Sequence, residues 1–326
     1  MKLSRISAIL AGLAVSLAAA APVAQAQTYP SRVVRLVIPY GPGGPTDVVG
    51  RILAQKLSES LGQQVVVENR LGAGGIVGTE SVARSAPDGY TVMFSASGAM
   101  VITPHLNSKL PYDPFRDFAP IALGATSPTV LMVGPNSSIH SVKDLIAQAK
   151  ANPGKLNYST AGVGTPPHLA AELLKSATGM DVQHVPYKGA PQADAAAISG
   201  EVTFIFTQPS IINLARAGKA RILGVSTAKR SALMPDVPTI AEAGVPGFEV
   251  LAWYGMLAPA KTPPEIVTRL NSDMMQALKQ KDVADRLQTL GFEPPAPHTP
   301  ADFLAYMRSE STKWQKVVKD ANIKVD

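Results

Sequence analysis

Residues 33–68 read VVRLVIPYGPGGPTDVVGRILAQKLSESLGQQVVVE and predict a strand, a turn, a helix and a second strand, in that order. The opening apolar run has the length of a strand, and the Gly/Pro-rich segment Pro39–Pro45 predicts the turn. From Thr46 onward apolar residues recur every three or four positions, as on an amphipathic helix, until Gly62 supplies a C-terminal stop. Gln64–Glu68 is the next strand.

The same pattern returns further along the chain. Leu156–Thr160 is a predicted strand, Ala161–Thr165 a glycine turn, and Pro166 opens a helix that stops at Gly179. The two units form a weak internal repeat. Strands that alternate with helices predict an α/β fold with a parallel or mixed sheet covered on both faces, and we expect a mixed sheet in each lobe.

Two lobes follow from this repeat and from the length of 326 residues, which exceeds one ordinary core. We expect one lobe to comprise residues 27–125 and 252–326, and the other residues 126–251. The chain then crosses between the lobes twice, which makes a hinge. Three helices are predicted in the tail, at Pro263–Lys279, Asp282–Leu290 and Thr299–Val318.

Composition excludes several classes of protein. Hydrophobic residues make up 46% of the chain and charged residues 17%, which excludes a disordered protein. There are no cysteines, hence no disulfide framework, no thiolate zinc site and no cysteine nucleophile. The formal net charge is +6, but the basic residues are scattered, so we expect no nucleic-acid partner.

Residues 1–26 have the layout of a secretory signal peptide. Lys2 and Arg5 precede the apolar stretch Ile6–Ala21, and Ala24-Gln25-Ala26 offers small residues where a signal peptidase cuts. The alternative is a membrane anchor. Sixteen helical residues span about 24 Å, short of the roughly 30 Å hydrocarbon core of a bilayer. We therefore expect cleavage after Ala26 and a mature protein that is soluble outside the cytoplasm.

The two glycine turns are candidate anion sites. Residues 40–47 and 161–165 each lie between a strand and a helix, where backbone N–H groups and the positive end of the helix favour an anion. A purely structural interpretation of residues 40–47 is a tight turn with Thr46 or Asp47 as the helix N-cap. The turn can be capped in this way and still bind an anion. Two such turns facing one cleft would bind a carboxylate from both sides.

Catalytic and cofactor motifs are absent from the sequence. Gly72–Gly78 fails the dinucleotide spacing because Val77 stands where the third glycine belongs. Ser97 follows a strand but lacks the preceding glycine of a nucleophile elbow. The five histidines show no metal-ligand spacing, and His168 is expected to cap or pack. We therefore predict no catalytic residues, no metal, no cofactor and no enzymatic activity.

Several motifs together resemble one family: PYGPGGPTDVVGR (39–51), VVVENRLGAGGIVG (65–78), GTPPHLAAELL (164–174) and HVPYKGAPQADAAAISGEV (184–202). This chain resembles the Bug-type receptors of tripartite tricarboxylate transporters. The resemblance implies a periplasmic, two-lobed type II binding-protein fold with a hinged cleft. It also implies capture of a small organic carboxylate, delivery to membrane permease subunits, and ligand contacts from the loops at 40–47 and 161–165.

Two departures from the family pattern bear on the ligand. Thr203 and Thr207 stand where the family often has aspartate, and losing a carboxylate near the cleft favours a plain organic acid over an amino acid. Pro45, where a small flexible residue is common, stiffens the first turn.

The reading we favour is a monomeric transport receptor, and the alternatives are a periplasmic sensory module and a secreted α/β hydrolase that uses Ser97. A cytoplasmic effector domain is disfavoured by the export signal. The residues predicted to bind the ligand are Tyr40, Gly43, Gly44, Thr46, Asp47, Ser97, Ala161, Gly162, Thr165, Tyr187 and Gln208.

Overall fold

The structure is a computed structural model of the 326-residue chain, and it describes residues 29–162, 165–187, 189–231, 234–320 and 323. The predicted signal peptide at 1–26 lies outside the described residues. Arg32–Asp326 form one compact unit. Among the residues described, no helix combines the length and apolar character needed to cross a membrane.

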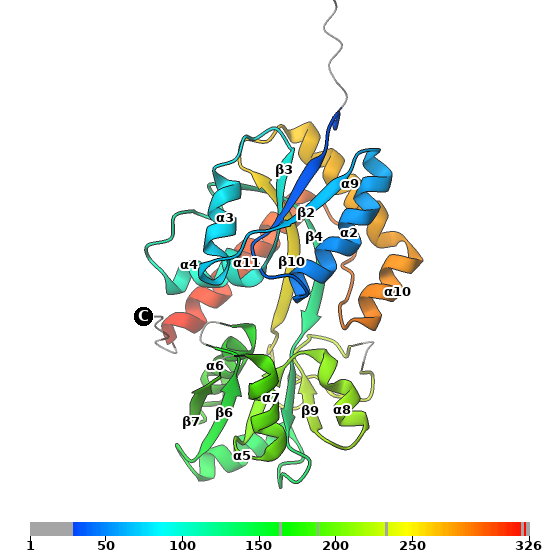
Figure 1. Cartoon of the computed structure of the whole chain (residues 1–326). Coiled ribbons are helices and arrows are strands. Elements are labelled where there is room, and N and C mark those ends of the chain that lie inside the picture. Colours follow the sequence, from blue (N-terminus) through cyan, green and yellow to red (C-terminus); the bar gives the residue numbers. More distant parts are fainter. Residues whose placement is uncertain (1–28, 163–164, 188, 232–233, 321–322, 324–326) are drawn as a thin grey trace, which may run out of the picture. The chain divides into compact units, whose positions relative to one another are not determined.

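One five-stranded sheet has the order β2-β1-β3-β10-β4 (Figure 1). Its strands are β1 (Val34–Ile38), β2 (Val65–Asn69), β3 (Thr91–Ala96), β4 (Phe118–Pro128) and β10 (Leu251–Pro259). β1 pairs in parallel with β2 and β3, whereas β10 pairs antiparallel with β3 and β4. The sheet is therefore mixed, as predicted.

The second five-stranded sheet has the order β7-β6-β8-β5-β9. Its strands are β5 (Val130–Val133), β6 (Leu156–Thr160), β7 (Val182–Pro186), β8 (Phe204–Thr207) and β9 (Arg221–Val225). β6 pairs in parallel with β7 and β8, and β5 pairs antiparallel with β8 and β9. The same alternation of pairings occurs in both sheets, so the internal repeat seen in the sequence corresponds to two lobes built alike.

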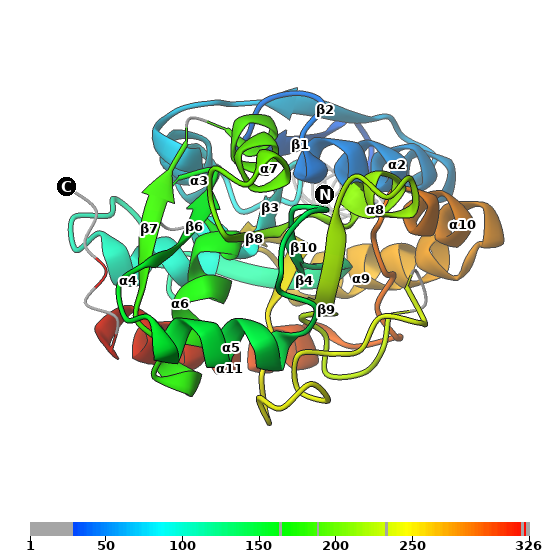
Figure 2. The same ribbon diagram turned by 90° about the horizontal axis from the view of Figure 1, so that it is seen from below.

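Helices cover the sheets on both sides, as Figure 2 shows from below. They are α2 (Pro45–Leu61), η1 (Ala73–Gly75), α3 (Ile76–Ala83), η2 (Gly98–Ile102), α4 (Thr103–Leu106), α5 (Val142–Ala151), α6 (Pro166–Thr178), α7 (Ala190–Ser199), η3 (Pro209–Ile211), α8 (Ile212–Arg216), α9 (Pro264–Lys279), α10 (Lys281–Thr289) and α11 (Pro300–Asp320). The tail helices are confirmed within one or two residues at each end.

Helix α2 shows why the local sequence folds as it does. Its predicted apolar face is buried, from Val49 to Leu61, and the helix packs on β1, β2 and α9. Gly62 ends it with φ of 67°, a left-handed conformation that favours glycine. Gly50 permits the close approach to β1, because a Cβ there would stand 2.7 Å from Ile38 Cδ1.

The chain passes between the lobes at Thr129, which joins β4 to β5, and again before β10. Ser226 ties these crossings together: its hydroxyl accepts from the N–H of Thr129 and donates to the carbonyl of Val250. β4 runs to Pro128 and pairs there with Leu251 of β10. The lobe limits at residues 125 and 252 stay a prediction.

Candidate functional site

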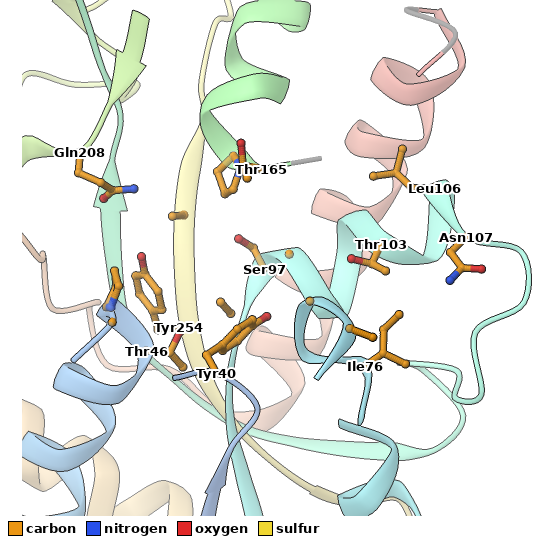
Figure 3. Close-up of a pocket in the computed structure, with 18 residues that line it drawn as sticks. Tyr40, Thr46, Ile76, Ser97, Thr103, Leu106, Asn107, Thr165, Gln208 and Tyr254 are labelled. Atoms are coloured by element: carbon orange, nitrogen blue, oxygen red, sulfur yellow. The ribbon is translucent and has the colours of Figure 1, made fainter. Parts of the chain in front are cut away.

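A cavity of about 660 Å³ receives residues from both lobes, as Figure 3 shows. Its lining residues are Tyr40, Gly44, Pro45, Thr46, Ala73, Gly74, Ile76, Ala96, Ser97, Gly98, Thr103, Leu106, Asn107, Thr165, Pro166, Gln208, Ala252 and Tyr254. None of these eighteen carries an ionisable acid or base other than the two tyrosines. Among the described residues, those that line the cavity offer a polar ligand only neutral hydroxyls, amides and backbone groups.

The first glycine turn brings the start of α2 to this cavity. Gly44 is the N-cap, with φ −74° and ψ 166°, and Pro45 occupies the first helical position that suits its fixed φ. The helix thus starts one residue earlier than predicted, and neither Thr46 nor Asp47 is the N-cap. Because no side chain caps this end, N–H groups of the first turn lack intrahelical acceptors beside the cavity.

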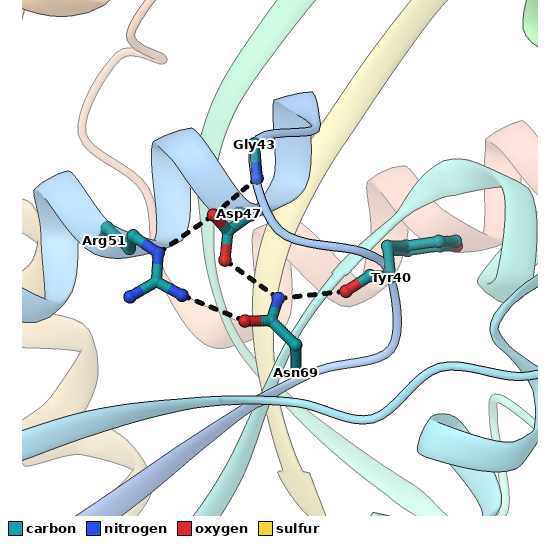
Figure 4. A network of polar contacts seen from close by, with 5 residues as sticks. All are labelled: Tyr40, Gly43, Asp47, Arg51 and Asn69. Atoms are coloured by element: carbon teal, nitrogen blue, oxygen red, sulfur yellow. Dashed lines mark hydrogen bonds and ion pairs between the residues drawn. The ribbon is translucent and has the colours of Figure 1, made fainter.

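Asp47 holds the turn by hydrogen bonds and is not among the residues that line the cavity (Figure 4). Its Oδ2 accepts from Gly43 N and Arg51 Nε, both at 2.9 Å, and its Oδ1 accepts from Asn69 Nδ2 at 2.8 Å. Asn69 Nδ2 also donates to the carbonyl of Tyr40, 2.9 Å away. Burial acts to raise the pKa of Asp47, but these hydrogen bonds outweigh it and hold the pKa below its usual value. The carboxylate therefore stays charged and fixes the turn.

Different hydrogen bonds hold the second glycine turn. Thr160 Oγ1 lies 3.2 Å from both the N and the O of Gly162, and 2.6 Å from His184 Nε2. Thr165 is the N-cap of α6, and its hydroxyl donates to Gly162 O at 2.9 Å. The φ of Gly162, +136°, requires glycine. Thr165 and Pro166 reach the cavity, so the start of a second helix borders it.

Ser97 supplies a buried hydroxyl between the two turns. It follows β3, is 1% exposed, and lines the cavity. Among the described residues its Oγ has no hydrogen-bond partner. A buried polar atom without a partner costs stability unless a ligand or water satisfies it. In Figure 3 this hydroxyl projects toward the side on which Thr165 lies.

Two tyrosines form aromatic walls. Burial raises the pKa of Tyr40, and burial likewise raises the pKa of Tyr254. Both side chains therefore carry a neutral, protonated hydroxyl group. Gly75 is needed beside Tyr40, because a Cβ at Gly75 would stand 3.0 Å from the ring.

Comparison with known proteins identifies the family. The family model described as "Tripartite tricarboxylate transporter family receptor" matches residues 49–323. The chain belongs to this family. Protein BugT of Bordetella pertussis is 36% identical over 327 residues and covers 100% of both chains.

Two solved structures of the same kind carry ligands. A protein of R. palustris solved with adipate is 37% identical, with a TM-score of 0.79 over 91% of this chain and 99% of that one. MatC from Rhodopseudomonas palustris, with bound malate, is 34% identical, with a TM-score of 0.75 over 89% of this chain and 100% of that one. The fold of this receptor is therefore the predicted two-lobed α/β fold of periplasmic binding proteins.

The structure brings together about half of the residues that the sequence predicted for the receptor's site. Those that line the cavity are Tyr40, Gly44, Thr46, Ser97, Thr165 and Gln208. Those that do not are Gly43, Asp47, Ala161, Gly162 and Tyr187. Gly43 and Gly162 take part in the hydrogen bonds that hold the two turns. The Tyr187 hydroxyl donates to Glu201 Oε1 at 2.8 Å, and Lys188 lies outside the described residues.

Other lining residues were not predicted. Gly74 lies in the glycine cluster after β2, which the sequence analysis tested only as a dinucleotide motif. Tyr254 lies within β10, and nothing in its sequence surroundings marked its ring as part of a site. Ile76 and Leu106 lie in segments whose spacing gave no sign of a site. No cluster of three or more potential metal ligands occurs in the part of the chain that the structure describes.

Proposed function

We propose that this protein is a periplasmic receptor that captures a small organic carboxylate and delivers it to the membrane permease subunits of a tripartite tricarboxylate-type transporter. One observation carries the proposal: the start of α2, the start of α6 and the buried Ser97 hydroxyl border one cavity, and no described residue that lines it has a charged side chain. Helix N-termini favour anions, and backbone amides hold a carboxylate without a cationic partner. The ligands of the two R. palustris relatives, adipate and malate, are of the same chemical class.

No described residue that lines the cavity has a carboxylate, which supports a plain acid over an amino acid. Thr207 is buried at the end of β8, and neither it nor Asp194 is among the residues that line the cavity. Thr203 instead donates to Asn157 Oδ1. An ammonium group would thus lose its hydration without gaining an ion pair.

Thermal-shift and calorimetric measurements on the mature chain test the proposal. Organic mono-, di- and tricarboxylates are expected to stabilise it, by about 2.7 kcal/mol at one hundred times the dissociation constant. Aspartate, glutamate and neutral sugars are expected to bind more weakly. Binding of sugars or amines in preference to every carboxylate would contradict the proposal.

Ser97→Ala tests the site itself. A hydrogen bond to a charged group contributes about 1.5–3 kcal/mol, so the variant should bind carboxylate about tenfold more weakly or worse. Ser309→Ala, an exposed serine of α11, is the matched control and should bind as the parent does. Unchanged affinity in Ser97→Ala would remove this hydroxyl from the site.

Location and partner need a cellular experiment. We propose that the mature protein begins at Gln27, acts as a monomer, and is required for carboxylate uptake through its permease. N-terminal sequencing of the periplasmic fraction and uptake by a deletion strain test these points together. A protein retained with residues 1–26, or uptake that persists without the receptor, would refute them.

A further inference from the structure

The cavity has two unlike sides, which Figure 3 separates clearly. Thr46, Gln208 and Tyr254 lie on one side, and Ser97 lies between this group and the other. On the opposite side two aliphatic side chains, Ile76 and Leu106, are labelled together with Thr103 and Asn107.

The aliphatic side is built from segments that meet only in the folded chain. Ile76 is the first residue of α3 and Leu106 the last residue of α4. Both are half-buried, pack against the large hydrophobic core, and line the cavity. Apolar surface left facing a cavity is stabilised when an apolar group of a ligand covers it.

The neighbouring polar groups fit this picture. Thr103 and Asn107 bring a hydroxyl and an amide, but no charge, to the same side. A carboxylate is better accommodated near Ser97 and the two helix starts. The space also exceeds a small acid: about 660 Å³ lies within the range of pockets that enclose drug-sized ligands. A four-carbon acid would leave the side chains of Ile76 and Leu106 exposed to water.

We infer that this site selects carboxylates with an extended hydrocarbon body, aliphatic or ring-shaped, over compact hydroxylated acids, and that Ile76 and Leu106 determine this specificity. The inference rests on the proposed function and sharpens it. The acid group binds near Ser97, and the hydrocarbon body covers the two aliphatic side chains. A compact hydroxy acid carries hydroxyls and offers little apolar surface for that side.

Chain length gives the test. Calorimetric dissociation constants are measured on the mature protein for straight-chain monocarboxylates and α,ω-dicarboxylates of four to eight carbons, with malate as the hydroxylated four-carbon acid. Each methylene that leaves water tightens binding about fourfold. We expect such a slope in whichever series binds, and malate should bind more weakly than succinate. A flat or rising dissociation constant in every series that binds overturns the inference but leaves the proposed function standing. Failure of every carboxylate to bind overturns the proposed function itself.

Two variants locate the effect. Leu106→Asn and Ile76→Thr each replace aliphatic surface with a polar group of similar size. We expect each to weaken binding of the longest acid about tenfold while the four-carbon acid binds as before, so that the slope with chain length falls. Leu214→Asn, on an exposed leucine of α8 outside the cavity, is the control and should keep the full slope. An equal loss for every acid, or no loss at all, would exclude these two residues as specificity determinants.

Discussion

The two glycine turns occupy equivalent places in two similar sheets, yet different chemistry holds each of them. The first is fixed by a charged group, Asp47, bonded to Arg51 and to Asn69 of the neighbouring strand. The second is fixed by a neutral hydroxyl, Thr160, which contacts His184 of its neighbouring strand. A strand-turn-helix unit can therefore present its helix start to a ligand whether a charged carboxylate or a neutral hydroxyl holds the turn. The charged brace should be stronger, and the histidine-linked brace should respond to mild acid.

The largest effect is expected from Asp47→Ala. Its side chain is 4% exposed and accepts three hydrogen bonds, so its removal leaves Gly43 N and Asn69 without that acceptor. We expect the free energy of unfolding to fall by about 3 kcal/mol, since bonds to a charged group are each strong, and carboxylate affinity to fall with it. Urea unfolding and calorimetry measure both quantities.

Arg51→Ala is the companion variant. The Arg51 side chain is 50% exposed, so water replaces much of what it loses and the effect should stay below about 1 kcal/mol. Equal losses in the two variants would mean that the ion pair, and not the bonds to the turn, stabilises the first lobe.

Acid should affect the second lobe before the first. His168, 4% exposed, lies against His184 with ring centroids 4.3 Å apart. Burial, the charge of His184 and that of Lys175 lower the pKa of His168 to about 4, and Glu172 opposes them only in part. A lowered histidine pKa means that the unfolded state binds the proton first. Stability is then complete above about pH 6.5 and is lost as the pH falls toward 4.

From pH 7.5 to pH 5 this single group should remove about 2 kcal/mol from the free energy of unfolding. His184, whose pKa burial also lowers, adds to the loss in the same direction. Asp47 behaves differently, because its lowered pKa keeps the carboxylate charged throughout this pH range. His168→Gln should flatten the decline between pH 7.5 and 5. A decline of the same steepness in that variant would assign the acid response to other groups.

Local patterns predicted much of this fold because the forces involved are local. Gly62 and Gly179 end their helices in the left-handed conformation, as expected. Ser141 caps α5 and accepts from Asp144 N, again as the spacing indicates. Each depends on residues within four positions of one another, so the sequence contains the whole interaction.

The site was predicted less well because its geometry depends on distant segments. The orientation of Asp47 is set by Asn69, twenty-two positions away on β2, and an acidic residue in the first turn of a helix gives no sign of that partner. Ile76 and Leu106 become cavity walls only after α3 and α4 pack on one core. Residues near glycine turns were therefore found, and the aliphatic side was not.

Thr160→Val should have an intermediate effect. The substitution keeps the shape of the side chain but removes the hydroxyl that contacts Gly162 and His184. A neutral hydrogen bond contributes about 1 kcal/mol, so we expect that loss in stability and roughly fivefold weaker carboxylate binding. Calorimetry at pH 7.5 checks the affinity. A variant as stable as the parent would show that His184 and Thr165 hold the turn without this hydroxyl.

Tyr187→Phe should have the smallest effect of all, and it separates the sequence prediction from the structure. The sequence placed Tyr187 among the ligand-binding residues, whereas its hydroxyl bonds Glu201 and its ring packs on the second lobe's smaller core. Loss of one hydrogen bond at an exposed carboxylate should change the free energy of unfolding by less than about 0.5 kcal/mol. Carboxylate affinity should stay within twofold of the parent. A tenfold loss of affinity at unchanged stability would instead put the hydroxyl in contact with the ligand, and the second lobe would then contribute a polar group beyond Thr165 and Gln208.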